Sequence, residues 1–156
     1  AELPDSYVGY IMIVAGVGMF VGNFLGARMI ELFSPVKSVV VSMCCMAITL
    51  LTNSFLASNS ITIFILSFIV GIITFSVTAP IQTAIIKAAK GAEKLGSSMN
   101  QSAFNMGNAS GAYFGGLPMV FGLQVTYSSV VGAILASIGA CIGIWILFVQ
   151  KKKARY

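Results

Sequence analysis

Long apolar runs separated by short polar connections make up almost the whole chain. Five of these runs are long enough to cross the hydrocarbon core of a bilayer, which takes about 20 helical residues. They lie at residues 7–30, 36–57, 61–86, 97–121 and 127–149. The runs lack the period-two alternation of barrel strands, so their backbone polar groups must be satisfied within helices. The pattern predicts an all-α membrane protein with five transmembrane helices.

Composition supports a membrane protein over a soluble one. Of the 156 residues, 58% are hydrophobic and 8% are charged, and the mean hydropathy is +0.96. A soluble domain typically carries about 25% charged residues, so these few could not cover a soluble globule of this size. We do not expect the first run to be a signal peptide, because Glu2 and Asp5 precede it in place of a basic start.

The positive charges are distributed unevenly between the two predicted membrane faces. All nine lysines and arginines fall on one side of the five-helix zigzag: Arg28, Lys37, Lys87, Lys90, Lys94, Lys151, Lys152, Lys153 and Arg155. Cytoplasmic connections of membrane proteins carry such an excess. We therefore expect a cytoplasmic C-terminus and an external residue 1. The net charge of +5 follows from this topology and does not call for nucleic acid.

Amide and hydroxyl side chains form stripes on three of the predicted helices. At about 100° per residue, Gln101, Asn105 and Asn108 fall on one side of the run at 97–121. Such groups in hydrocarbon need either a partner on a neighbouring helix or water. Three amides in two turns favour a polar cavity over a single helix contact. The candidate lining residues are Asn23, Thr74, Thr78, Gln82, Gln101, Asn105 and Asn108. The runs at 36–57 and 127–149 carry few large polar groups, so we expect them to face lipid.

Glycines add two further signals. Gly107, Gly111 and Gly115 form a row at spacing four that would let another helix pack closely. The sequences GNFLGA at 22–27 and GNASGA at 107–112 share Gly-Asn-x-x-Gly-Ala. A chance match is one explanation. The other is an inverted repeat of three helices, as in secondary transporters, with one helix missing before the first.

Reactive chemistry is absent from the apolar runs. The chain has no histidine, and no aspartate or glutamate lies deep in a predicted span. The three cysteines lie in apolar runs without metal-ligand spacing and are interpreted as packing residues. The sequence therefore predicts no enzyme, no catalytic residues, no metal site and no cofactor. Pro80 lies inside the third run, where it predicts a kink because it cannot donate a backbone hydrogen bond and crowds the carbonyl of Ser76.

Several of these segments resemble the major facilitator superfamily, in particular bacterial arabinose- or sugar-efflux and drug-efflux permeases. The similarity is clearest in APIQ at 79–82, AFNMGNASGAYFGG at 103–116 and GNFLGARMIELFSPVKS at 22–38. Two positions depart from the family's motifs. Leu32 stands where the cytoplasmic loop signature has an arginine, which puts the usual gating salt bridge in doubt. Ala112 stands where the antiporter motif has a proline, which weakens the case for a kink there.

The resemblance implies an architecture larger than this chain. Residues 1–156 would form helices eight to twelve of a twelve-helix transporter, which is most of its C-terminal six-helix bundle. The N-terminal half and the seventh helix would be missing. Family members line their central cavity, within this half, with helices seven, eight, ten and eleven, which agrees with the three polar stripes. The implied location is the bacterial inner membrane, as a multi-pass protein.

The leading functional hypothesis is part of an alternating-access efflux permease, coupled to protons, that exports a sugar or small drug-like solute. Its expected partners are the solute, the lipid bilayer and the missing N-terminal half of the same transporter. A proton-binding group would have to lie in the missing segments, because this chain has no ionisable residue deep in a span. The rival hypothesis is a self-contained five-helix structural or partner subunit without transport activity. The coding sequence upstream of residue 1 would distinguish the two.

Overall fold

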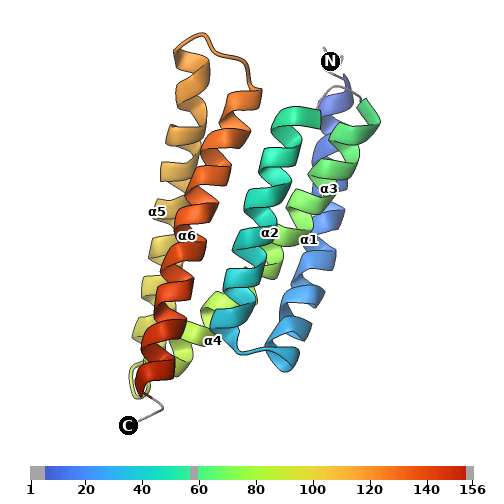
Figure 1. The fold of residues 1–156 in the computed structure, drawn as a ribbon. Helices are drawn as coiled ribbons and strands as arrows, with labels where there is room; N and C mark the ends of the chain where they lie inside the picture. The colour runs from blue at the N-terminus through green and yellow to red at the C-terminus, as the bar shows by residue number, and fades with distance from the viewer. Residues whose placement is uncertain (1–5, 57–59, 154–156) are drawn as a thin grey trace.

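The protein is a bundle of long helices (Figure 1). The computed structural model describes residues 6–56 and 60–153, and all regular secondary structure there is helical. The elements are α1 (Ser6–Leu32), α2 (Pro35–Leu56), α3 (Ser60–Ser76), α4 (Thr78–Ala88), α5 (Glu93–Val120) and α6 (Thr126–Lys153). The prediction of an all-α fold with five long helical passes is confirmed, with α3 and α4 together forming the third pass.

The third pass is interrupted at Val77, as the proline predicted. Pro80 is fully buried and has no N–H to donate to the carbonyl of Ser76. Separately, the Ser76 hydroxyl donates to the carbonyl of Ile73, at 2.9 Å, and lies 3.3 Å from the hydroxyl of Ser42 on α2. The break therefore lies at a buried polar contact between α2 and the third pass.

Four of the five passes are both long and apolar enough to span a membrane: Tyr7–Leu32, Pro35–Leu56, Ile61–Ala88 and Thr126–Lys153. The predicted span at 97–121 does form the 28-residue helix α5, which at 1.5 Å per residue is also long enough. It is not among the apolar four because amides, serines and glycines replace many of its apolar positions. Helix α5 therefore needs polar surroundings along part of its length.

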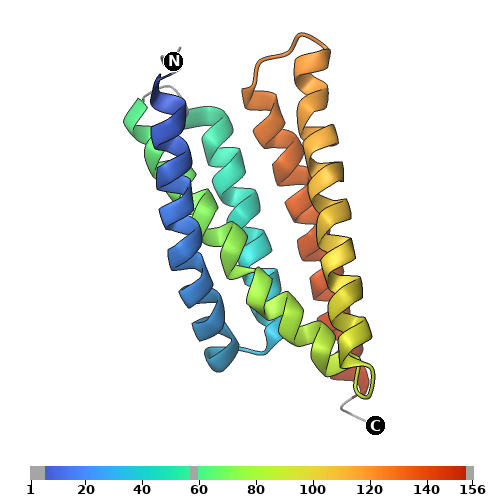
Figure 2. The same ribbon diagram turned by 180° about the vertical axis from the view of Figure 1, so that it is seen from behind.

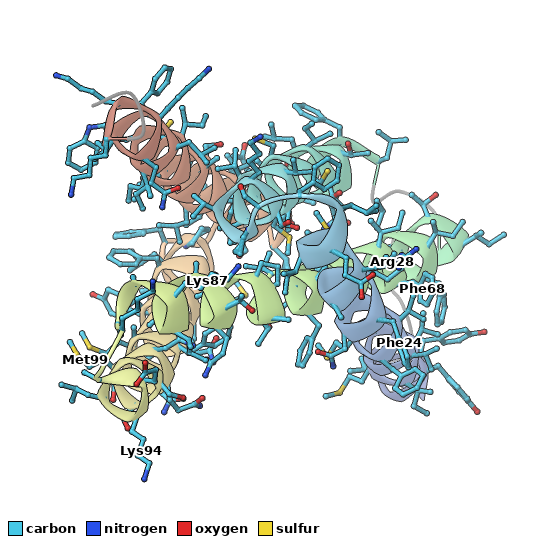
Figure 3. All side chains as sticks on the ribbon, turned by 90° about the horizontal axis from the view of Figure 1, so that it is seen from below. Phe24, Arg28, Phe68, Lys87, Lys94 and Met99 are labelled. Atoms are coloured by element: carbon cyan, nitrogen blue, oxygen red, sulfur yellow. The ribbon has the colours of Figure 1, made fainter. Side chains whose placement is uncertain are left out.

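The helices lie on two sides of a diagonal pass (Figures 2 and 3). Helices α1 and α5 lie on one face of the molecule, α2 and α6 lie on the opposite face, and α3–α4 crosses between them. Two of the three passes with polar stripes, α1 and α5, therefore form one face, and the third, α3–α4, lies directly beneath it. The two passes that were expected to face lipid lie together behind them.

The closest helix contact joins α1 to α3. A Cβ atom added to Gly18, Gly22 or Gly26 would come closer than 3.0 Å to a backbone carbonyl oxygen of the third pass, those of Phe68, Ile72 and Ser76 respectively. Gly71 on α3 meets the carbonyl of Ala15 in the same way. Small residues let two membrane helices approach until their backbones touch. The three glycines of α1, Gly18, Gly22 and Gly26, which we call the packed row, fix α1 against the diagonal pass.

Small residues also seat α6 on α2. Ala133, Ala136 and Ala140 are buried along one side of α6. Gly143, on the same side, lies against Val40, and Gly139 lies against the sulfur of Met43. Where α2 ends and α6 begins, the Asn53 amide donates to the hydroxyl of Ser129 at 2.9 Å. The outer faces of both helices remain apolar, with Phe55, Trp145 and Phe148 more than two-thirds exposed.

The connections place the described basic residues at one end of the bundle. The α1–α2 turn, the α4–α5 turn and the end of α6 all lie at that end (Figure 1), and Arg28, Lys87 and Lys94 are labelled there in Figure 3. Arg155 lies outside the described residues.

In the α4–α5 turn, Gly91 has φ +83°, and its N–H donates to the Glu93 carboxylate at 2.9 Å. That bond, and the N–H of Glu93 itself, lower the pKa of the carboxyl.

Candidate functional site

The candidate lining residues lie on α1, on the diagonal pass formed by α3 and α4, and on α5. Asn23 lies on α1, Thr74 on α3, and Thr78 and Gln82 on α4. Gln101, Asn105 and Asn108 lie on α5. Helices α1 and α5 do not touch one another and are linked through the diagonal pass (Figure 3). The arrangement groups these helices on one face but does not bring all seven side chains into one pocket of the described residues.

The amide row of α5 is exposed. Gln101, Asn105 and Asn108 are all exposed, and none is hydrogen-bonded to another described residue. Leaving an amide in hydrocarbon without a partner costs roughly 2–7 kcal/mol on transfer scales. Three such residues cannot face lipid without a large loss of stability. The row must therefore face water or further protein.

Asn23 occupies a comparable position on α1. It is exposed and belongs to a stripe that also contains Phe20 and Phe24, whose rings pack edge to face 5.4 Å apart. The packed row lies on another side of the same helix. Asn23 is therefore directed away from α3, on a surface that mixes one amide with aromatic side chains.

Gln82 has a different environment from the α5 amides. Its side-chain N–H donates to the hydroxyl of Ser97 at 2.8 Å, and its carbonyl accepts from the amide of Asn100. Asn100 is buried, with 6% of its surface exposed. This Gln82–Ser97–Asn100 cluster joins α4 to α5, so Gln82 is held in an interhelical contact. Gln82 is only partly buried, so part of its surface remains available to line a cavity as well.

Ser97 and Asn100 are not among the lining residues that the sequence predicts. Asn100 lies about 100° around the helix from Gln101, outside the amide stripe, so the stripe gave no reason to choose it. The signal in the sequence that could have pointed to them is Gly96, a small residue one turn before Asn100. It is buried, and a Cβ there would meet the side chain of Ala89. A buried small residue next to polar ones marks the place where α5 leaves the turn and crosses α4.

Of the two threonines, Thr74 is hydrogen-bonded within its own helix. The Thr74 hydroxyl donates to the carbonyl of Val70 at 2.7 Å. Thr74 also lines a small cavity of about 280 Å³ between α1, α2 and α3, together with Ser67 and Asn53. Thr78 is half-buried at the start of α4. Thr74 therefore faces a separate hollow from the one that the α5 amides would line.

The predicted packing glycines on α5 have no neighbour among the described residues. A Cβ built on Gly107, Gly111 or Gly115 would meet nothing within 4 Å. We call these three the open row. The row with the same spacing of four that does pack closely is the packed row on α1, at 18, 22 and 26. The sequence shows this spacing as well, but it singles out only Gly22 and Gly26, through the repeat.

Comparison with known proteins supplies the family. The model of the Major Facilitator Superfamily matches residues 2–156, which is almost the entire chain. The chain belongs to this superfamily. The resemblance seen in APIQ, AFNMGNASGAYFGG and GNFLGARMIELFSPVKS is thereby confirmed at the level of the family. As a member, it is a multi-pass membrane protein, in agreement with its apolar helices.

Several bacterial relatives share this segment of the superfamily. AraJ of Escherichia coli K12 is 35% identical over 132 residues, and the inner membrane transport protein YdhP of the same strain is 33% identical over 134. Each match covers 85% of this chain. A "Probable sugar efflux transporter" of Haemophilus influenzae PittGG is 30% identical over 138 residues, or 88% of this chain. The chain spans about a third (34%) of the length of each relative. No solved structure matches it significantly.

Proposed function

We propose that the chain is the C-terminal part, helices eight to twelve, of a secondary transporter that exports a sugar or small drug-like solute by alternating access. Membership of the Major Facilitator Superfamily supports transport, and the name of the Haemophilus influenzae relatives supports sugar efflux. The length of the relatives supports a larger protein, of which this chain is about a third. The name of YdhP supports the inner membrane of a bacterium.

The observation that carries the proposal is the exposed amide row of α5. A membrane-length helix with Gln101, Asn105 and Asn108 unpartnered on one side requires a polar environment on that side. In a transporter the requirement is met by a central, water-filled pathway. Amides suit a polar uncharged solute such as a sugar, because each offers both donors and an acceptor to hydroxyl groups.

The open row supports a missing partner for α5. In the first copy of the Gly-Asn-x-x-Gly-Ala repeat, Gly22 and Gly26 pack α1 against α3. The corresponding glycines of the second copy, Gly107 and Gly111, lie open on α5. If the copies are related as an inverted repeat, α5 packs in the same way against a helix that precedes α1. We assign that helix to the remainder of the transporter.

Coupling to protons, which we include in the proposal, would depend on residues outside this chain. Its four carboxylates are Glu2, Asp5, Glu31 and Glu93. The first two precede α1, Glu31 is in its last turn and Glu93 begins α5. A group that binds and releases protons within the membrane is usually an intramembrane ionisable residue. The N-terminal half and the helix before α1 would have to supply it, with the C-terminus of this chain in the cytoplasm.

The test is export by the intact protein after the amide row is made apolar. Asn105→Leu combined with Asn108→Leu is expected to reduce solute efflux at least tenfold with an unchanged amount of protein in the membrane. The control is Ser110→Leu, which adds the same apolar side chain on the opposite side of α5, where Ser110 is also exposed. Efflux of a labelled sugar from loaded cells and the quantity of membrane protein are measured together. Undiminished export in the double variant would refute the lining role and favour a structural subunit.

A further inference from the structure

A second polar feature lies at the basic end of the bundle, on the side away from the amide row. An open cavity of about 540 Å³ lies between the beginning of α2 and the end of α6. Its walls are formed by Ser34, Lys37, Ile144, Leu147, Phe148, Gln150 and Lys151. The residues come from α6 and from the beginning of α2 with the residue just before it, which are far apart in the chain and adjacent in space. The site is therefore created by the fold and is not a local basic segment.

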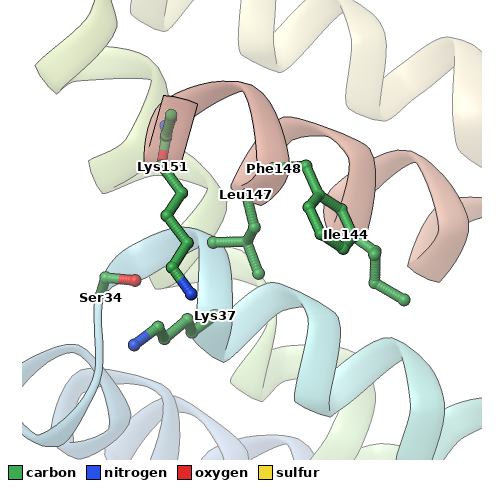
Figure 4. Close-up of a pocket in the computed structure, with 7 residues that line it drawn as sticks. Ser34, Lys37, Ile144, Leu147, Phe148 and Lys151 are labelled. Atoms are coloured by element: carbon green, nitrogen blue, oxygen red, sulfur yellow. The ribbon is translucent and has the colours of Figure 1, made fainter. Parts of the chain in front are cut away.

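Two lysines converge on this cavity (Figure 4). The Lys151 side chain extends from the end of α6 toward the beginning of α2, where Lys37 lies in the first turn and Ser34 just before it. Within residues 6–56 and 60–153, the ion pair between Arg28 and Glu31 accounts for the salt bridges. Neither cavity lysine is therefore paired with a described carboxylate. The beginning of α2 adds the positive end of its helix dipole. The cavity concentrates positive charge that only an anion would compensate.

The opposite wall of the cavity is apolar. Ile144 and Phe148 line it, and Phe148 is 68% exposed. Trp145, 69% exposed, continues the same apolar surface along the outside of α6. Lysines and a tryptophan at the end of an apolar span are typical of the boundary between hydrocarbon and headgroups. A site with cations at that boundary and apolar side chains just inside it fits a molecule with both kinds of group.

We propose that this cavity binds one anionic phospholipid, with its phosphate between Lys37 and Lys151 and an acyl chain along Ile144, Leu147 and Phe148. The Ser34 hydroxyl and the Gln150 amide can donate further hydrogen bonds to headgroup oxygens. A free inorganic phosphate would leave the apolar wall unused. The proposal concerns the outer surface of α2 and α6 and does not depend on the transport pathway on the other face.

The test measures lipid binding to the purified, delipidated full-length protein by native mass spectrometry. Phosphatidylglycerol is titrated in, and phosphatidylcholine with identical acyl chains is titrated in parallel. Phosphatidylglycerol is expected to bind at least tenfold more tightly. Because a direct hydrogen bond between charged groups typically contributes about tenfold or more in affinity, Lys37→Gln combined with Lys151→Gln should weaken this binding roughly tenfold or more.

The matched control is Lys152→Gln combined with Lys153→Gln, which removes the same charge from neighbouring positions that do not line the cavity. It should change the affinity by less than about twofold. Equal weakening in both double variants would indicate diffuse attraction by the basic end and overturn the site. Displacement of the lipid by millimolar inorganic phosphate would indicate a free-anion site and overturn the lipid assignment.

Helix content and thermal unfolding of each variant are compared with those of the unsubstituted protein, because a collapsed bundle would also lose lipid. If the double variant is not recovered folded, Lys151→Gln alone should weaken phosphatidylglycerol binding about threefold or more. Unchanged binding in that single variant would overturn the proposal.

Discussion

The packed row and the open row carry the same glycine spacing in opposite surroundings. Gly18, Gly22 and Gly26 on α1 lie against backbone carbonyls of the diagonal pass, whereas a Cβ on Gly107, Gly111 or Gly115 of α5 would meet nothing. In both cases glycine removes the side chain that would keep two helices apart. The difference shows that the spacing marks a surface suited to close packing, while the partner is decided by the rest of the fold. On α1 the partner is α3.

The largest effect is expected where the row is packed. Gly22→Leu places a branched side chain where the first carbon already comes closer than 3.0 Å to the carbonyl of Ile72. Because the obstacle is backbone, α1 and α3 must separate, and overpacking of this severity costs about 3 kcal/mol or more. Unfolding of the full-length protein in mixed micelles measures the loss. Unchanged unfolding would mean that the two helices do not touch at Gly22.

A smaller but still clear effect is expected in the open row if α5 has a partner outside this chain. Gly107→Leu should cost about 1–3 kcal/mol in the full-length protein, because a helix packed there would be displaced. Ala109→Leu, on the other side of α5 and also exposed, is the control and should unfold like the unsubstituted protein. Identical behaviour of the two variants would show that Gly107 borders water or lipid, and the analogy between the rows would fail.

The same contrast explains which parts of the fold could be predicted from the sequence. The helices were predictable because about 20 apolar residues in a row allow little else in a bilayer, and the break at Val77 followed from the missing N–H of Pro80. The choice of packing glycines was incomplete, because the row at 107, 111 and 115 and the row at 18, 22 and 26 are equivalent until the helices are assembled. The polar stripe of α5 was likewise visible, since it depends only on helical period.

The part of the candidate site that could not be predicted depends on how helices cross. Gln82 lies on the predicted face of the third pass, yet its hydrogen bonds go to Ser97 and Asn100. Those contacts exist because the four-residue turn at 89–92 brings the beginning of α5 back over α4. Asn100 is buried by this crossing, while Asn105 and Asn108, further along the same helix, have moved away from α4 and are exposed. Residue type is the same at all three positions, and only distance from the crossing separates them.

That separation predicts the smallest effect on stability at the exposed end of the comparison, Asn108. Asn100→Leu removes the donor to Gln82 and leaves the carbonyl of Gln82 without its partner, a change that typically costs about 1–3 kcal/mol. Asn108→Leu removes an amide of the same type from an exposed position and should alter unfolding by less than about 0.5 kcal/mol. Both free energies are measured by the same mixed-micelle unfolding of the full-length protein. A larger loss for Asn108→Leu than for Asn100→Leu would mean that the amide row is itself buried in the complete transporter. The row would then hold helices together, and a water-filled pathway would have to be sought along another surface of α5.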